Sequence, residues 1–133
     1  MKILFLTAIL TLGLGGLFSA NAAEPETLVV NVGQQKTSVH GKFKVKVVEI
    51  IEDSRCPVGT TCVWAGNAKI KITLAKGKKA AKTFELNSTL DPRVIVFEGY
   101  DIRFVDLSPR PGEQVKRRAF DPCVTFSITK HVK

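Results

Sequence analysis

In several short runs of this chain, apolar side chains occupy every second position. The clearest run is Lys42–Val47, where three apolar residues alternate with three lysines. A second is Val124–Thr129, where Val, Phe and Ile alternate with Thr and Ser. A period of two is typical of a β-strand with one buried face, and the 3.6-residue period of a helix is missing after residue 23. The chain is therefore predicted to be all-β.

Turn-forming residues divide the apolar runs into about seven short strands. These strands are predicted at residues 28–32, 42–51, 64–74, 83–86, 94–97, 100–107 and 124–129. Glu49 interrupts the apolar stretch 48–51, which indicates a bulge. Val94–Phe97 is apolar at every position, which indicates a strand covered on both faces or lying near a sheet corner. Short strands without helices favour an antiparallel β-sandwich of immunoglobulin-like scale, with a partly open β-barrel as the alternative.

The first 23 residues are interpreted as a secretory signal peptide. Lys2 precedes the apolar run Ile3–Phe18, and small residues follow at 19–23, so cleavage is expected after residue 22 or 23. A membrane anchor is the alternative, but the apolar run is shorter than the ~18–20 residues that a spanning helix needs. No cysteine lies at the cleavage site, as a lipoprotein would require. We therefore expect a single domain, residues 24–133, that is periplasmic or secreted and has no membrane span.

The expected export also decides how the cysteines are interpreted, because thiols oxidise outside the cytoplasm. Cys56 and Cys62 enclose five residues, among them Pro57 and Gly59, which favour a tight turn. A Cys56–Cys62 disulfide is predicted, and its small ring contributes only ~2–2.5 kcal/mol by loop entropy. A redox or metal-binding role is the alternative. Redox pairs usually enclose two residues at a helix N-terminus, and the spacing fits no common zinc site, so no metal or cofactor is expected.

Two further residues are placed by the phase of the neighbouring strands. Trp64 shares the even phase of Ile70 and Ile72, which predicts a core position beside Cys62 and not a surface platform for ligand stacking. Cys123 has the opposite phase to the apolar positions of the last strand. It is predicted to be a free, partly covered thiol. The alternative is an intermolecular disulfide that gives a Cys123-linked dimer in place of a monomer.

The chain is basic, with 20 Lys and Arg against 12 Asp and Glu and a net charge of +8. Lysines alternate on two predicted strands that a hairpin through the cysteine loop would make neighbours. The resulting patch comprises Lys42, Lys44, Lys46, Lys69 and Lys71. Such a patch suits an anionic envelope component, but lysines that protect strand edges from aggregation explain the pattern equally well. No aromatic residues are interleaved, so no specific nucleic-acid partner is expected.

Motifs of catalysis are missing from the sequence. Only two histidines occur, His40 and His131, and no nucleophile elbow, phosphate-binding loop or His-Glu-x-x-His pattern is present. Cys123 is the only cysteine left as a nucleophile, and its neighbours match no catalytic signature. No catalytic residue is assigned, and the protein is not expected to be an enzyme.

One motif carries a resemblance to known proteins. Asp53-Ser54-Arg55-Cys56-Pro57, followed by Cys62-Val63-Trp64-Ala65-Gly66, resembles a motif of uncharacterised small exported bacterial proteins, which are often lipoproteins. Those proteins also tend to carry a tyrosine-led strand that ends in a proline turn, as Tyr100–Pro111 does here. The resemblance covers most of the chain after residue 23, but it implies no established activity. Cys123 and the missing lipobox depart from the pattern.

Together these observations predict a small exported domain that binds a protein or an anionic envelope component without catalysis. A protease or hydrolase inhibitor presenting the disulfide loop is a further alternative, with Arg55 as its exposed residue. The candidate binding rim is Asp53, Arg55 and Pro57, at the edge of the loop. We interpret this rim as a turn held by an Asp53–Arg55 pair, with a contact surface as the alternative.

Overall fold

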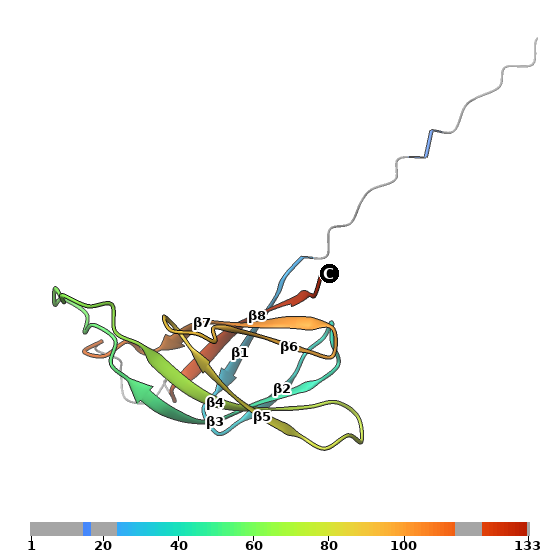
Figure 1. Ribbon diagram of the computed structural model, residues 1–133, viewed down its shortest axis with the longest axis horizontal. Coiled ribbons are helices and arrows are strands. Elements are labelled where there is room, and N and C mark those ends of the chain that lie inside the picture. The colour runs from blue at the N-terminus through green and yellow to red at the C-terminus, as the bar shows by residue number, and fades with distance from the viewer. Residues whose placement is uncertain (1–14, 17–23, 114–120, 133) are drawn as a thin grey trace, which may run out of the picture.

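A computed structural model describes residues 15–16, 24–113 and 121–132 (Figure 1). Apart from residues 15–16, the predicted signal peptide lies outside the described residues, as do residues 114–120. The described part of the chain contains no helix with the length and apolar character needed to cross a membrane.

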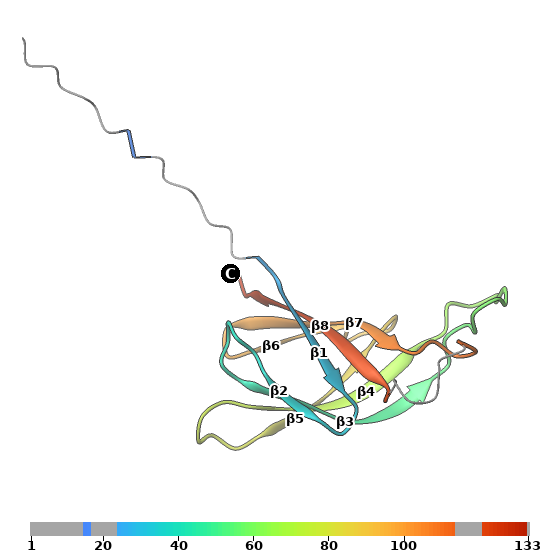
Figure 2. The same cartoon turned by 180° about the vertical axis from the view of Figure 1, so that it is seen from behind.

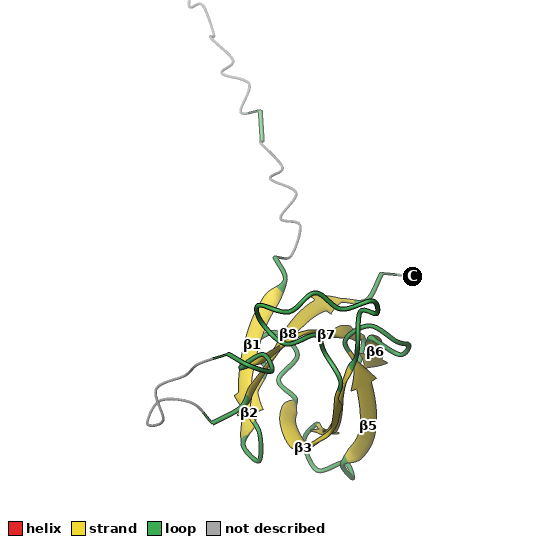
Figure 3. Cartoon of the chain, turned by 90° about the vertical axis from the view of Figure 1, so that its left-hand side faces the viewer, coloured by secondary structure: helices red, strands yellow, loops and turns green. Residues whose placement is uncertain are grey.

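In the described residues, eight strands form two four-stranded antiparallel sheets that face each other (Figures 1 and 2). The strands are β1 Glu26–Asn31, β2 Gln35–Thr37, β3 Lys44–Asp53, β4 Ala68–Ala75, β5 Lys82–Asn87, β6 Val94–Phe97, β7 Tyr100–Ser108 and β8 Cys123–Lys130. One sheet has the order β1-β8-β7-β6 and the other the order β2-β3-β4-β5. The two sheets do not close into a barrel, so the predicted β-sandwich is confirmed (Figure 3).

The chain crosses between the two sheets after β1 and after β5, and otherwise runs from each strand to its neighbour. A tight turn makes the first crossing, in which the Gln34 amide donates to the Asn31 carbonyl. The last strand pairs with the first, so that Val124 lies opposite Val30. As a result, the loops after β3, β5 and β7 all leave from one end of the sandwich.

Apolar side chains from both sheets meet between them and form the core. The predicted alternation is confirmed on β4 and β8 and in the parts of β3 and β7 that precede their bulges, where the apolar positions are buried and the alternate positions face outward. The buried apolar residues are Leu28, Val30, Phe43, Val45, Val47, Ala68, Ile70, Ile72, Leu74, Leu86, Phe97, Ile102, Phe104, Leu107, Val124, Phe126 and Ile128. Each large side chain among them contributes ~1.5–3 kcal/mol on burial.

The strand boundaries correct the prediction in several places. β2 is not predicted by the sequence, because its three residues are polar, exposed and without periodicity. β3 begins at Lys44, because Lys42 has a φ of 54° and lies in the preceding turn. β6 is an edge strand in which Val96 is 54% exposed, so it is not covered on both faces. The predicted bulge is confirmed by register shifts within β3, at Val47/Glu49 and again after Ile50.

The two ends of the sandwich differ in composition. We call residues 54–67, 88–93 and 109–113, which follow β3, β5 and β7, the loop end. In Figure 1 the 54–67 segment, drawn in green, projects to the left beyond the ends of the strands, and Figure 2 shows the same projection from behind. At the opposite end, which we call the aromatic end, the rings of Phe43, Phe84, Phe97 and Tyr100 gather.

Candidate binding site

The 54–67 segment is a closed loop with a narrow neck. The Cys56–Cys62 disulfide predicted from the sequence is confirmed, with the two Cα atoms 5.9 Å apart. At the neck, the Ser54 amide donates to the Asn67 carbonyl at 2.8 Å, and the Asn67 amide donates to Ser54 Oγ at 3.0 Å. Gly66 has a φ of +69°, and a Cβ at this position would collide with the Ser54 carbonyl oxygen. Only glycine fits such a close backbone approach.

Arg55 ties the base of this loop to the end of β7. Its Nε and Nη2 donate to the two carboxylate oxygens of Asp53 at 2.8 and 2.9 Å. Its Nη1 donates to the Leu107 carbonyl at 2.6 Å, and Nη2 also donates to the Pro109 carbonyl at 3.1 Å. The fixed fork of a guanidinium is suited to such a bidentate contact. The predicted Asp53–Arg55 pair is therefore confirmed.

The predicted exposure of Arg55 is wrong, because its side chain is only 10% exposed. The two backbone carbonyls beyond β7 draw the guanidinium inward, a contact that sequence spacing does not reveal. The hydrogen bond from Arg55 lowers the pKa of the Asp53 carboxyl, although burial opposes the shift. The same hydrogen bond raises the pKa of Arg55, so the pair is ionised at neutral pH.

Asn67 ties the base of the same loop to the loop after β5. It is 5% exposed, and its Nδ2 donates to Asn87 Oδ1 at 2.9 Å. Its Oδ1 accepts hydrogen bonds from the Thr89 amide at 3.1 Å and the Leu90 amide at 3.4 Å. Asn67 is a site residue that was not predicted, and its only signal in the sequence is its place next to Gly66 in a turn-forming pair.

A third contact joins the disulfide loop to the segment after β7. The Val58 amide donates to the Pro111 carbonyl at 2.9 Å. Together with Arg55 and Asn67, this bond links all three segments of the loop end. Within the described residues, every buried side-chain nitrogen and oxygen has a hydrogen-bond partner. The interior of the loop end is thus polar and fully bonded.

The outer surface of the loop end is apolar by contrast. Four side chains form what we call the apolar rim: Val58, Val63, Trp64 and Leu90, which are 50%, 96%, 65% and 59% exposed. The prediction that Trp64 packs in the core is wrong. β4 begins only at Ala68, and the bends at residues 63 and 64 break the strand phase that the prediction extended through Gly66.

The tip of the disulfide loop carries no charge, whereas the other two segments of the loop end have exposed charged side chains, among them Asp91 and Arg110. Residues 56–66 include no charged side chain, in a chain of which 24% is charged, and Arg55 below them is paired. An open cavity of about 320 Å³ is lined by Glu52, Ser54, Ala65, Gly66, Asn67, Thr89 and Leu90. Of the predicted rim residues, Arg55 is held at the base of the loop by the partly exposed Asp53, and Pro57 is exposed on the loop.

The predicted lysine patch is only partly brought together. Lys44, Lys46, Lys69 and Lys71 lie on the paired strands β3 and β4, whereas Lys42 lies in the turn before them. Two of these lysines have acidic partners, whereas Lys44 and Lys46 lie opposite Ala75 and Thr73. Lys71 pairs with Glu49 at 3.1 Å, and Lys69 pairs with Glu85 at 3.2 Å. The outer face of this sheet is thus a mixed-charge surface.

Cys123 forms no disulfide within the described residues and is half-buried at the start of β8, in the phase predicted. It lies opposite Asn31 on β1 and Ser108 on β7. The described residues contain no group of three or more His, Cys, Asp or Glu side chains that could hold a metal ion.

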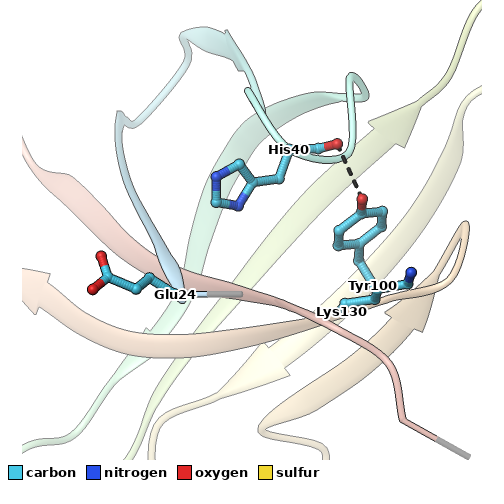
Figure 4. Close-up of a pocket in the computed structure, with 4 residues that line it drawn as sticks. All are labelled: Glu24, His40, Tyr100 and Lys130. Atoms are coloured by element: carbon cyan, nitrogen blue, oxygen red, sulfur yellow. Dashed lines mark hydrogen bonds between the residues drawn. The ribbon is translucent and has the colours of Figure 1, made fainter. Parts of the chain in front are cut away.

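The histidines lie at the aromatic end. A cavity of about 340 Å³ is lined by Glu24, His40, Tyr100 and Lys130, and the Tyr100 hydroxyl donates to the His40 carbonyl at 3.1 Å (Figure 4). His131 Nδ1 lies 2.7 Å from Asp101 Oδ1. The His40 ring is therefore near the cavity, and His131 is in contact with a carboxylate.

At the same end, Glu26 caps the turn between β2 and β3. Its carboxylate accepts hydrogen bonds from Ser38 Oγ and the Val39 amide, each at 2.7 Å, and from the His40 amide at 3.2 Å. Burial alone would raise the pKa of this carboxyl, but the three hydrogen bonds together lower it. This cap is a structural contact that needs no ligand.

The loop end is the surface with the clearest features of a binding site. It combines a fixed polar interior, an exposed tryptophan and an uncharged tip. Comparisons with models of known protein families, with curated proteins and with solved structures find no match for this chain.

Proposed function

We propose that this chain is an exported, non-catalytic domain that binds another protein through the apolar rim of its loop end. The observation that carries the proposal is the exposure of Val63 and Trp64, at 96% and 65%, on a loop that is held rigid from beneath. Large apolar side chains that face solvent together are typical of interaction sites, and tryptophan is enriched among the residues that dominate binding energy.

The rigidity of the loop supports the same proposal. Association costs free energy when flexible loops must be ordered on binding. Here the disulfide, the Arg55 clamp and the bonds to Asn67 fix the backbone beneath the rim before any partner is bound. Because this backbone is already ordered, less of the free energy gained from contacts is lost to ordering the loop, and the affinity for a partner is higher.

A protein partner is better supported than an anionic envelope component or a glycan. Residues 56–66 carry no charge, and Lys69 and Lys71 are already paired with glutamates. Glycan sites need polar groups that are free to bind hydroxyls. Beside the rim, the side chains of Ser54 and Asn67 are already bonded within the protein.

Export is supported by two features. Residues 1–23 have the charge, apolar run and small residues of a signal peptide. The Cys56–Cys62 disulfide is typical of proteins outside the cytoplasm. Since the disulfide closes the loop that carries the rim, we infer that its role is structural.

Site-specific photo-crosslinking tests the proposal. A photoreactive amino acid at Val63 is expected to give a discrete crosslink to another protein in the envelope or secreted fraction of the producing cells. The matched control is Val39, which is 76% exposed at the aromatic end and is expected to give none. Adding Trp64→Ala should remove the crosslink at position 63. Equal crosslinking at both positions, or none at position 63, would contradict the proposal.

A further inference from the structure

The shape of the loop end limits the kind of partner surface that fits it. The 54–67 loop projects beyond the strands as a narrow convex tip (Figures 1 and 2). Val63 and Trp64 are adjacent in the chain and lie on this projection, with Val58 in the same disulfide-closed segment. A convex apolar tip buries its side chains fully only in a concave apolar site, and such sites are characteristic of enzyme clefts.

On this basis, and resting on the proposed function above, we infer that the tip occupies the substrate cleft of an endopeptidase that selects apolar or aromatic residues. The protein is then a reversible inhibitor of that peptidase. Val63-Trp64 offers the chemistry that such a cleft recognises in its own substrates, namely a peptide backbone bearing large apolar side chains. No covalent step is involved, since contact alone blocks the cleft.

The contacts of Arg55 exclude it as a residue that a trypsin-like peptidase could bind. A trypsin-like cleft places a carboxylate at the base of its specificity pocket and needs a free basic side chain. Arg55 cannot serve, because its guanidinium is held by Asp53 and by two backbone carbonyls. The exposed side chains of the loop are instead suited to an apolar pocket.

The way the loop is closed explains why it inhibits and is not consumed as a substrate. The disulfide spans residues 56–62, and the neck bonds between Ser54 and Asn67 close the remainder of the loop. A cut at any bond within these closures leaves both new ends held in place. The bond from Val58 to Pro111 also ties the disulfide-closed part of the loop to the segment after β7.

Inhibition assays with three peptidases test the inference. Chymotrypsin and subtilisin, which have apolar specificity pockets, and trypsin, which has an acidic one, are assayed with fluorogenic peptides. The full domain is expected to inhibit at least one of the first two at concentrations up to about 100 µM and to leave trypsin active. Trp64→Ala and, separately, Val63→Asp should each weaken inhibition by at least about tenfold, whereas Val39→Ala should leave it unchanged. Circular dichroism checks that all variants are folded.

The outcomes separate this inference from the proposed function. If neither apolar-selective peptidase is inhibited while the crosslink at position 63 persists, the inference fails and protein binding stands. If both the inhibition and the crosslink are missing, both fail. Equal inhibition of trypsin, or inhibition that survives both tip substitutions, also overturns the inference, because the apolar tip would then not be the inhibitory contact.

Discussion

The two ends of this sandwich are held together by different kinds of contact, aromatic packing at one end and hydrogen bonds at the other. At the aromatic end, the Phe43 and Phe97 rings meet edge to face, with centroids 5.5 Å apart and planes at 85°. Phe84 packs on Phe97 in a similar way, with centroids 6.2 Å apart. Such contacts add about 0.5–1.5 kcal/mol per pair beyond the burial of area. This end is closed by apolar packing.

At the loop end the corresponding space is filled by polar groups. The Arg55 guanidinium donates four hydrogen bonds, two to the Asp53 carboxylate and one each to the carbonyls of Leu107 and Pro109. Asn67 binds the loop after β5 through Thr89 and Leu90. Hydrogen bonds with a charged partner contribute about 1.5–3 kcal/mol when they replace contacts with water. This end is closed by directional contacts.

The difference explains where each end places its aromatic residues. At the aromatic end the rings pack in the interior, and the Glu26 carboxylate caps the neighbouring turn through Ser38. Where polar groups fill the interior, the fold does not need the only tryptophan of the chain, and Trp64 stays outside. A loop whose stability does not depend on its apolar side chains can present them to a partner.

Truncating an aromatic side chain at each end gives the largest expected contrast. Phe43→Ala should lower the free energy of unfolding by about 3–5 kcal/mol, because Phe43 is fully buried and leaves a cavity. Trp64→Ala should change it by less than about 0.5 kcal/mol, because the ring is mostly exposed. Urea unfolding followed by far-UV circular dichroism measures both values.

Should Phe43→Ala fail to fold, Phe43→Leu, with a smaller cavity, provides the measurable variant. Similar losses for the two positions would mean that Trp64 supports the fold. The contrast between an aromatic interior and an aromatic rim would then be wrong.

Removing the Arg55 clamp is the second test, with a smaller expected effect. Arg55→Ala should lower the free energy of unfolding by about 2–3 kcal/mol, because it leaves the carbonyls of Leu107 and Pro109 without donors and Asp53 without its counter-charge. Arg103→Ala, at an exposed position on β7, is the matched control and should stay within about 0.5 kcal/mol.

Hydrogen exchange shows whether the loss is local to the loop end. Arg55→Ala should speed amide exchange at Val58, whose bond to Pro111 depends on the position of the segment after β7. The Ser38 amide at the aromatic end, bonded to the Phe43 carbonyl, should be affected far less. Equal acceleration at the two amides would show that the two ends are not separately closed.

Much of the fold is predictable from sequence because one face of most strands is buried. The strict alternation at Phe43, Val45 and Val47 specifies both the strand and its inner face. β2 escapes prediction because Gln35–Thr37 buries nothing and is held only by its ladder with β3. A strand of exposed polar residues at the edge of a sheet shows no alternation of apolar and polar positions, so its sequence does not predict it.

The site is predictable only where its contacts are local. The Cys56–Cys62 disulfide and the Asp53–Arg55 pair join residues close in sequence, and both are confirmed. The bond from Arg55 to Leu107 spans 52 residues, and nothing in the spacing of the sequence points to it. Trp64 is misplaced for a related reason. A two-residue period cannot be extended through a glycine with a positive φ, as at Gly66.

The dependence of stability on acid pH compares the two ends through one carboxyl at each, Glu26 at the aromatic end and Asp53 at the loop end. Of the three tests, it has the smallest expected change in the free energy of unfolding. The folded-state pKa values of Glu26 and Asp53 lie below their ordinary values of 4.5 and 3.8. As the pH falls, the unfolded chain therefore takes up protons before the folded chain does. The stabilisation from both carboxyls should be complete at neutral pH and decline as the pH falls below these values, with the Glu26 contribution starting to decline first.

Glu26→Gln and Asp53→Asn separate the two contributions. Each variant should be less stable than the parent chain at neutral pH, and each should lose less stability than the parent between neutral pH and about pH 3. Because both side chains are partly exposed, we expect each difference to be about 1 kcal/mol or less. Urea unfolding at a series of pH values measures it. If both variants followed the parent curve throughout, neither carboxylate would stabilise its end, and the Asp53–Arg55 clamp would have to act through the backbone carbonyls alone.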